Sequence, residues 1–360
     1  MHMADALLAP SVAAVMYAAS AAAAGVSIAR LKREERTRVD TPVNKLPAMA
    51  VMAALVFAGQ MINYTIPGTG SSGHLCGGMM LSGILGPFAG FLSMIVVLTI
   101  QCLFFADGGL MALGANVWNM AFYGCFVGYF LIYRPIMRSG LFSSRGENAA
   151  NRMKIVLASI LGCVITLQLG AFSVVLETSA SGVTELPFGM FCALMLPIHL
   201  AIGLIEGLIT SAVLLFVYES RPELLCEVSM GGQVSNRRSL GATVVALAVI
   251  AALVGGGLSL AASSNPDGLE WALFGNAEGG YGENMGLDEE KFGIESGAAD
   301  TAASIQEKTA FLPDYAFSGD EENPAGTTVS GLVGSLLVAL IAAAVCALGG
   351  FFRKKAAAKS

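Results

Sequence analysis

Charged residues are scarce in this chain. Only 13% of its 360 residues are charged, against roughly 25% in a soluble domain, while 55% are hydrophobic and the mean hydropathy is +0.69. This scarcity excludes a water-soluble enzyme. The charges are also segregated, because residues 263–328 hold 14 acidic and 2 basic side chains and so carry −12, while the remainder carries +6. The sequence therefore predicts an integral membrane protein with one acidic, water-exposed excursion.

Several catalytic motifs are absent. The chain contains no GxxxxGK(S/T) phosphate loop, no HExxH zinc-protease motif and no GxSxG nucleophile elbow. It also lacks a cluster of acid, base and nucleophile in one leaflet, so a membrane enzyme is the weakest interpretation. Without a phosphate loop the chain is not itself the ATPase of a pump, and a separate energy source is required.

Cysteine and histidine are both rare. The seven cysteines form no CxxC pair, and six of them fall within apolar segments or at their ends. These cysteines are expected to be small buried apolar residues, and no structural disulfide is predicted. The only histidines are His2, His74 and His199, so any histidine chemistry has to use these positions.

Apolar runs long enough to cross a membrane fill most of the sequence. A spanning helix needs roughly 20 apolar residues. The runs are residues 6–29, 46–66, 75–106, 108–133, 155–176, 186–218, 239–264 and 323–352. The third run is too long for one simple span and contains Gly86-Pro87, which should end one helix and begin another. We predict a short helix near 75–86 and a full one at 88–105.

The basic residues predict the orientation. Outside the acidic stretch they form four clusters, at 30–45, 134–154, 221–238 and 353–359. Lys and Arg near helix ends favour the cytoplasmic side. If all four clusters are cytoplasmic, the chain makes about nine crossings including the short helix, with the N-terminus outside and the C-terminus inside. The predicted fold class is an all-α integral membrane protein, a polytopic helix bundle, with the acidic stretch outside.

The N-terminus is expected to remain uncleaved. A secretory leader begins with a positively charged region, which is missing because apolar sequence follows His2 almost at once. The alternative is a processed leader that ends within the small residues 18–24. A large second residue normally prevents removal of the initiating Met, so the chain should begin with the free amine of Met1.

A histidine in second position can chelate a metal. The Met1 amine, the His2 backbone amide once deprotonated and a His2 imidazole nitrogen can form fused rings around one ion. Four roughly coplanar nitrogens suit Cu(II) or Ni(II), and Co(II) is close in the affinity series. The fourth nitrogen could come from His74, which is predicted to lie on the same outer side as His2.

His74 belongs to a glycine-rich segment. Residues 67–78 hold five glycines, which allow a tight, non-helical path. At membrane depth such a path is tolerated only where it is buried in protein or lines a cavity, and transporters often build a site from an irregular loop before a short helix. The alternative is a loop that packs against small residues, with His74 at the interface for solubility.

Two other ionisable residues fall inside one predicted helix. His199 and Glu206 share a face but lie about 10.5 Å apart along the axis, so they cannot touch directly. Ionisable groups in a span are functional candidates by default, and a packing or interhelical hydrogen-bond role is the alternative. Asp107, at a turn on the outer surface, is expected to cap the following helix or to bond a neighbouring loop.

Three segments, in order, resemble one transporter family. They are residues 1–8 (MHMADALL), residues 72–78 (SGHLCGG) with Gly86-Pro87 after them, and residues 105–121 (FADGGLMALGANVWNMA). Over residues 1–218 the chain resembles the CbiM/NikM family, the substrate-binding membrane components of energy-coupling factor (ECF) transporters for cobalt and nickel. Residues 265–271 (NPDGLEW) and 312–317 (LPDYAF), before a final apolar helix, resemble the PDGLE-type (NikN/CbiN-like) accessory component.

The resemblance implies a domain organisation. Residues 1–220 would form the metal-binding membrane domain and residues 221–238 a cytoplasmic linker. Residues 239–360 would form the accessory segment, in which two helices flank the acidic outer loop 263–328. In the family the N-terminus is tucked into a pocket of an all-helical bundle, and transport is powered by a separate membrane coupling (T) component and two cytoplasmic ATPases.

The resemblance also implies the site. It is a square-planar set made by the N-terminal amine, the His2 amide and imidazole, and one nitrogen of a histidine that matches His74. The family often has Ile or Pro near positions 3 and 4, where this chain has Met3 and Ala4. That departure should matter little, because the chelate uses atoms of Met1 and His2.

We therefore expect the substrate-binding part of an ATP-driven Ni²⁺ or Co²⁺ uptake system in the prokaryotic cytoplasmic membrane. The chain would capture the ion at Met1, His2 and His74 and would not be an enzyme. The expected partners are the T component, two ATPase subunits, the divalent ion and membrane lipid, with no permanent cofactor and no nucleic acid. Planar geometry and the PDGLE-type segment favour nickel slightly, with cobalt uptake linked to vitamin B12 close behind. The alternative is an ion-coupled secondary carrier for a cation that uses His199 and Glu206.

Overall fold

The computed structural model describes residues 1–37, 46–183, 186–228, 240–285, 287, 292–317 and 323–357. Most of these residues are helical. The long helices are α1 (Pro10–Thr37), α2 (Leu46–Gln60), α4 (Pro87–Phe105), α7 (Glu147–Ala180), α8 (Phe188–Ser220), α9 (Leu240–Gly256) and α12 (Pro324–Ala357). The shorter ones are α3 (Gly78–Leu85), α5 (Leu113–Asn116), α6 (Arg134–Arg138), α10 (Gly268–Phe274) and α11 (Gly297–Thr309). A π-helical stretch, η2 (Val117–Tyr133), joins α5 to α6 in one continuous rod.

Single 3₁₀ turns punctuate the connections between the helices. They are η1 (Asp5–Leu7), η3 (Ser143–Arg145), η4 (Pro222–Leu224), η5 (Leu258–Ala261) and η6 (Pro313–Tyr315). The predicted first span starts later than expected, because Pro10 begins α1 and the residues before it form η1 and an extended tail. Proline suits the first helical position, where its missing N–H leaves no intrahelical hydrogen bond unmade.

Six helices of the described residues are long and apolar enough to cross a membrane. They are Pro10–Glu34, Pro87–Phe105, Leu113–Arg138, Glu147–Ala180, Phe188–Ser220 and Ala325–Ala344. Two shorter apolar helices, Ala48–Gln60 and Gly241–Gly256, and the short α3 complete the set. Each predicted crossing therefore has a helix, while the number of nine crossings and the orientation stay predictions.

The break predicted at Gly86-Pro87 is confirmed. Helix α3 ends at Leu85, Gly86 adopts a φ of 89°, and Pro87 is the first residue of α4. At its other end α3 follows Gly77, whose φ of 84° also favours glycine. Every residue of α3 is buried, so this short helix lies inside the bundle.

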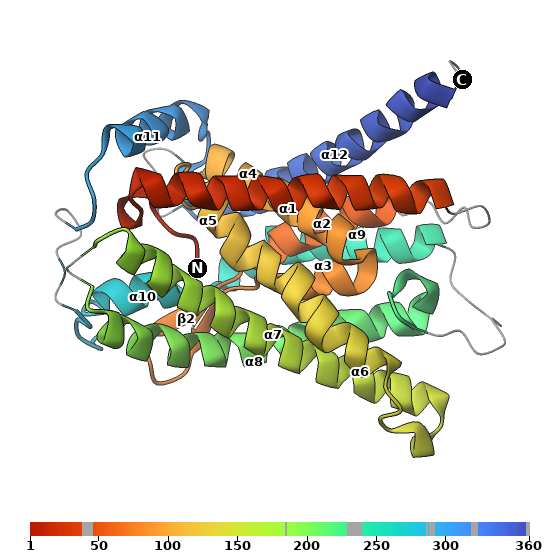
Figure 1. The fold of residues 1–360 in the computed structure, drawn as a ribbon. Helices are drawn as coiled ribbons and strands as arrows, with labels where there is room; N and C mark the ends of the chain where they lie inside the picture. The colour runs from red at the N-terminus through yellow and green to blue at the C-terminus, as the bar shows by residue number, and fades with distance from the viewer. Residues whose placement is uncertain are drawn as a thin grey trace.

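The helices run between two ends of an elongated bundle. Figure 1 shows α6 and the C-terminal ends of α1 and α12 at one end, and α10, α11 and β2 (Ser71–Gly73) at the other. The first end carries predicted cytoplasmic clusters and the second the predicted outer elements, as the expected orientation requires. Residues 38–45, 229–239 and 358–360, which hold part of these clusters and most of the predicted linker, lie outside the described residues.

A small β-hairpin departs from the all-α prediction. Strands β1 (Tyr64–Ile66) and β2 pair antiparallel, with Tyr64 opposite Gly73 and Ile66 opposite Ser71. The turn between them uses Gly68 and Gly70, at φ of 78° and 74°. Glycine tolerates this left-handed backbone at little cost, so the glycine-rich segment folds back on itself instead of extending α2.

The accessory segment packs as part of the same bundle. Helix α12 meets α9 closely, since a Cβ added at Gly331 would lie 1.9 Å from the carbonyl oxygen of Gly255. Both helices also contact α2. Phe57 of α2, Phe105 of α4 and Tyr315 of η6 form an aromatic cluster with centroid distances of 5.5 and 4.9 Å for the two pairs that share Phe105. Residues far apart in sequence thus share one apolar core with the N-terminal helices.

Candidate metal centre

The first residues of the chain are held deep inside the outer end of the bundle. Asn116 of α5 binds both main-chain groups of Met3: its Oδ1 accepts from the Met3 N–H at 2.7 Å, and its Nδ2 donates to the Met3 carbonyl at 3.2 Å. The N–H of Gly109 donates to the same carbonyl at 2.9 Å. The side chains of Met1 and Met3 are buried. This clamp fixes how far the N-terminus enters the pocket.

The Met1 amine meets a carboxylate from the accessory segment. Its nitrogen lies 3.0 Å from Oδ2 of Asp267, and the same oxygen lies 3.7 Å from Nε2 of His74. Burial, the largest single effect, lowers the pKa of the amine, but the Asp267 carboxylate, Cys76 and Asp107 together more than offset it, and the pKa of the amine is raised. Burial by itself would raise the pKa of Asp267. The Met1 amine and His74 more than offset this effect, so the pKa of the carboxyl lies well below its usual range. Amine and carboxylate form a buried ion pair.

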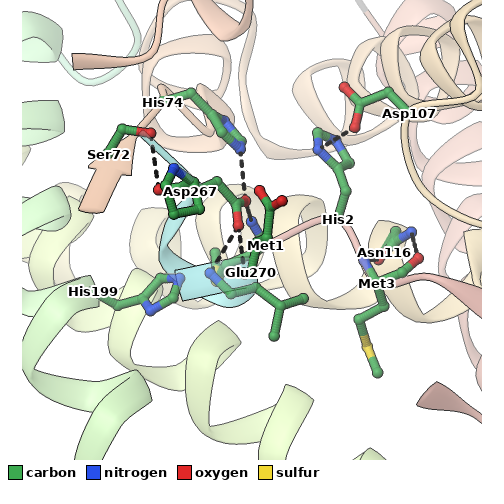
Figure 2. Close-up of polar contacts among 12 residues, drawn as sticks. Met1, His2, Met3, Ser72, His74, Asp107, Asn116, His199, Asp267 and Glu270 are labelled. Atoms are coloured by element: carbon green, nitrogen blue, oxygen red, sulfur yellow. Dashed lines mark hydrogen bonds and ion pairs between the residues drawn. The ribbon is translucent and has the colours of Figure 1, made fainter. Parts of the chain in front are cut away.

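The loop before α3 aims His74 at this pair. Nδ1 of His74 lies 3.1 Å from the carbonyl oxygen of Leu75, and because a carbonyl only accepts, Nδ1 carries the proton of that hydrogen bond. Nε2 is therefore the ring nitrogen that faces Asp267, and in the neutral imidazole it is the nitrogen left to bind an ion. Figure 2 shows His74, Met1 and Asp267 converging from three separate segments.

His2 lies beside His74 but is held from the opposite side. The two imidazole rings stack with centroids 5.3 Å apart and an interplanar angle of 14°. Nδ1 of His2 donates to Oδ1 of Asp107 at 2.9 Å, and its buried Nε2 has no hydrogen-bond partner among the described residues. The structure thus brings together Met1, His2 and His74, the three residues selected from the sequence.

Asp107 links His2 to the accessory segment. The hydroxyl of Tyr315 donates to its Oδ2 at 2.5 Å. Burial alone would raise the pKa of Asp107, but His2 and the Tyr315 hydroxyl lower it to about 2. Of the two roles expected for Asp107, the structure shows the bond to a neighbouring segment, and adds the contact with His2 that sequence reasoning missed.

Asp267 is fixed by the PDGLE-type sequence around it. Its Oδ1 accepts from the N–H groups of Leu269 and Glu270 at 2.9 and 2.8 Å, so Asp267 caps α10 with one oxygen and leaves the other for Met1 and His74. The N–H of Ser72 in β2 donates to the Pro266 carbonyl at 2.8 Å and ties the hairpin to this turn. Gly268 permits the close approach of α10 to α8, since a Cβ at this position would lie 2.9 Å from the side chain of Ile202.

The sequence signalled these partners only in part. The motifs 265–271 and 312–317 marked the accessory segment, but no spacing rule connects Asp267 or Tyr315 to residues more than 200 positions earlier. Asn116, in the motif 105–121, was likewise not selected as a site residue. An N-cap signal at Asp267, an Asp before Gly-Leu-Glu, is the one local clue, and it points to a helix start and not to a metal.

His199 and Glu206 both lie on α8 but form hydrogen bonds with different segments. Glu206 accepts from the N–H groups of Cys76 and Gly77, at 3.0 and 2.9 Å, and so holds the loop between His74 and α3. Nδ1 of His199 donates to the Met195 carbonyl of its own helix at 2.8 Å. Glu206 thus has the hydrogen-bonding role named as the alternative to chemistry, and it positions the segment that carries His74.

Replacing Glu206 by Gln should weaken metal binding about tenfold. The amide offers one acceptor oxygen where the carboxylate offered two, so a buried N–H of Cys76 or Gly77 loses its partner. Calorimetric titration with Ni²⁺ measures the change, and Glu219→Gln, on the far end of α8, is the control. Unchanged binding together with loss of uptake driven by a pH gradient would instead favour the secondary carrier.

The site lies between two cavities. A cleft of about 1210 Å³ reaches His2, His74, Asp107 and Asp267 and is lined by further acidic residues: Asp5, Glu270, Glu278, Glu283 and Asp314. A second cavity, of about 10 Å³, is lined by Met1, His74, Cys76, His199 and Asp267, among others. His74 and Asp267 line both, so they stand at the boundary between the acidic cleft and the interior.

The arrangement is not a conventional cluster of metal-binding side chains. Across the described part of the chain, no group of three or more His, Cys, Asp or Glu side chains is placed to hold an ion. The donors that converge here include a main-chain amine. They suit a chelating site and a substrate ion better than a structural metal held by side chains alone.

Comparison with known proteins identifies the chain. Residues 2–224 match the family described as the cobalt uptake substrate-specific transmembrane region, CbiM. The chain belongs to the CbiM family. Residues 241–349 match the PDGLE domain, so this CbiM-family protein carries a C-terminal PDGLE domain. The resemblance inferred from the three N-terminal segments and the two C-terminal motifs is confirmed.

Relatives of this CbiM-family protein share either its full length or its first part. The fused nickel transport protein NikMN of Archaeoglobus fulgidus is 35% identical over 345 residues, 94% of this chain and 95% of its own. That of Rhodobacter capsulatus is 29% identical over 369 residues and covers 96% of both chains. The cobalt transport protein CbiM of Sorangium cellulosum is 30% identical over 190 residues, 53% of this chain and 80% of its own.

Family membership and the apolar helices together settle the location. Six helices suited to spanning a bilayer and a CbiM transmembrane region make this a multi-pass protein of the prokaryotic cytoplasmic membrane. Among the described residues, no cysteine whose side chain is placed forms a disulfide, and most of these cysteines are buried.

Proposed function

We propose that this protein is the substrate-binding component of an ATP-driven uptake system for Ni²⁺ or Co²⁺. The observation that carries the proposal is the convergence of the Met1 amine, His2 and His74 in a buried pocket at the predicted outer end of the bundle. The names of its relatives, which are nickel and cobalt transport proteins, support the same substrate class.

The proposed site is a plane of four nitrogens. The Met1 amine and the deprotonated His2 amide close one chelate ring on the ion, and the amide with Nδ1 of the same histidine closes a second. Nδ1 is required because Nε2 points away from the main chain of its own residue. Nε2 of His74 supplies the fourth nitrogen, and square-planar nitrogen sites are typical of Ni²⁺ and Cu²⁺.

Nickel is the favoured substrate. The two relatives that cover nearly the whole chain, the PDGLE domain included, are named as nickel transport proteins, whereas the cobalt transport proteins of Sorangium cellulosum and Geobacter sulfurreducens cover 53% and 70% of it. The planar geometry favours the same ion. Cobalt remains the competing substrate, and the relative affinities of the purified protein for the two ions decide between them.

We further propose the predicted division of labour along the chain. Residues 1–220 bind the metal, residues 221–238 form a cytoplasmic linker, and residues 239–360 form the accessory segment with its acidic outer loop. The acidic side chains that line the 1210 Å³ cleft would raise the local concentration of divalent cations in front of the site. The nine crossings and the outward N-terminus are part of the same proposal.

Energy has to come from partner proteins. Because the sequence contains no phosphate loop, we propose a membrane coupling (T) component and two cytoplasmic ATPase subunits as partners. Gene neighbours that encode an ATPase and a coupling membrane protein would supply the subunits for a reconstitution.

The test is uptake of radioactive Ni²⁺ into proteoliposomes. The complete complex should accumulate the ion only with internal ATP, and His74→Ala should reduce uptake at limiting Ni²⁺ to near the level of empty vesicles. Glu223→Gln, at the opposite end of the molecule, serves as the control for the substitution. Uptake by the chain alone, driven by a pH gradient, would contradict the proposal.

A further inference from the structure

Asp267 stands where two nitrogens of the proposed site meet. Its Oδ2 lies 3.0 Å from the Met1 amine and 3.7 Å from Nε2 of His74. Nitrogen and oxygen ligands lie about 2.0 to 2.2 Å from a divalent ion such as zinc, which places neighbouring ligands about 3 to 3.5 Å from one another. Both separations are therefore close to those of ligands on a single ion.

A cavity of matching size lies at the same place. The small cavity of about 10 Å³ is lined by Met1, His74 and Asp267. That volume is close to the minimum that holds one water molecule, so a fully hydrated ion does not fit. An ion in this position would have shed most of its water and would be bound by the protein atoms around it. The hydrogen bond from Nδ1 of His74 to Leu75 leaves Nε2 to serve as one of them.

His2 is not placed to complete this set. Its Nδ1, the nitrogen that the fused chelate needs, donates to Asp107, which in turn accepts from Tyr315. A four-nitrogen plane requires His2 to turn away from Asp107. The atoms of Met1, His74 and Asp267 already converge without such a change.

We propose that Met1, His74 and Asp267 form a capture site, in which a divalent transition-metal ion binds to two nitrogens and one carboxylate oxygen before His2 closes the four-nitrogen plane. This inference rests on the proposed function. The hydrogen bonds to Oδ1 of Asp267 hold the carboxylate in place, so Oδ2 is a preorganised ligand at the inner edge of the acidic cleft. Capture displaces one proton from the Met1 ammonium to water in the cleft. When His2 turns, its amide nitrogen and Nδ1 replace the oxygen. The amide proton then leaves to water in the cleft, and the proton of Nδ1 passes through water to Nε2 of the same ring.

Capture also gives the accessory segment a chemical role. Asp267 supplies a ligand of the first complex, while Tyr315 holds Asp107 and thereby keeps His2 aside until the ion has arrived. Both residues come from the segment that follows residue 239. The accessory segment therefore contributes directly to loading of the metal ion, in addition to packing over the site.

The test uses the full-length chain in nanodiscs with Co²⁺ as the probe. His2→Ala removes the imidazole of the final plane but keeps the three capture ligands. We compare it with His2→Ala/Asp267→Asn and with His2→Ala/Glu283→Gln. Asn caps a helix as well as Asp does, so α10 keeps its start. Glu283 lines the same cleft and is exposed, which makes its substitution a matched loss of one negative charge.

The expected result is weak but measurable binding to His2→Ala. Adding Asp267→Asn should lower this residual affinity by at least about tenfold and change the Co²⁺ absorption bands, since a ligand is lost. Adding Glu283→Gln should change it by less than about twofold. In the wild-type background, Asp267→Asn should slow loading about tenfold and leave the absorption spectrum of the final complex unchanged.

Three results would contradict the capture site. The capture site is overturned if Asp267→Asn has no greater effect than Glu283→Gln, or if His2→Ala binds no metal at all. It is also overturned if Asp267→Asn alters the spectrum of the final wild-type complex, because Asp267 would then belong to the final site. Failure of the proposed function looks different: His2→Ala would bind metal as tightly as the wild type.

Discussion

Adding two residues before Met1 should weaken Ni²⁺ binding by about a hundredfold or more, because it converts the proposed amine ligand into an amide without changing any side chain. The buried amine also loses its ion pair with Asp267, and the added residues have to enter a pocket that already encloses Met1. An extension with the sequence Met-Glu keeps its own initiating Met and is suited to the purpose. Calorimetric titration of the purified full-length protein measures the loss.

The length of this extension matters. A single added residue would move His2 to the third position, where the new amine, two amides and the imidazole could again form a four-nitrogen chelate. Two added residues avoid that alternative. The control is the same dipeptide added after Ser360, which should leave binding unchanged. Wild-type affinity of the N-terminally extended protein would show that the Met1 amine is not a ligand.

Replacing Asn116 by Ala should weaken Ni²⁺ binding about thirtyfold. Asn116 pairs with both the N–H and the carbonyl of Met3, and its loss leaves the buried N–H without that acceptor, at a cost of about 1–3 kcal/mol. The carbonyl keeps the N–H of Gly109, so the tail is loosened but not released. Because the proposed ligands of Met1 and His2 directly precede Met3, any shift of Met3 moves them away from His74.

Comparison of variants separates this effect from general destabilisation. Asn151→Ala, on α7 near the opposite end, removes an amide that bonds Tyr218 and should leave metal affinity unchanged. Melting temperatures of the two variants should be similar, since each loses a small number of hydrogen bonds. If Asn116→Ala bound Ni²⁺ like the wild type, the clamp on Met3 would not set the position of the N-terminus.

Two carboxylates at the inner edge of the acidic cleft hold the N-terminal residues in place. The Met1 amine contacts the carboxylate of Asp267, and the imidazole of His2 contacts the carboxylate of Asp107. In a medium of low dielectric such contacts are strong only when both partners are present. Loss of either carboxylate is therefore expected to change the position of a proposed metal-binding nitrogen as well as its surroundings.

Apolar runs and basic clusters sufficed to predict much of the architecture. The break at Gly86-Pro87, a helix for each predicted crossing, and the placement of His2 and His74 at one end could all be argued from residue types and their spacing. The hairpin of β1 and β2 could not, because the glycines of residues 67–78 permit a turn without specifying how the flanking residues pair. The hydrogen-bonding role of Glu206 was among the alternatives, but its partners could not be named for a similar reason, since they are main-chain groups of a distant loop.

Residue types and their order along the chain were enough to predict the side of the membrane on which each residue lies and the chelating potential of Met1 and His2. Hydropathy and charge act along the membrane normal, so they sort residues by depth and not by lateral position. Only the tertiary structure decided that Asp267 touches Met1, 266 positions away, and that Tyr315 holds Asp107. Those contacts depend on how α10 docks through Gly268 and on how α12 packs on α2 and α9, which is a matter of close packing between surfaces that no one segment encodes.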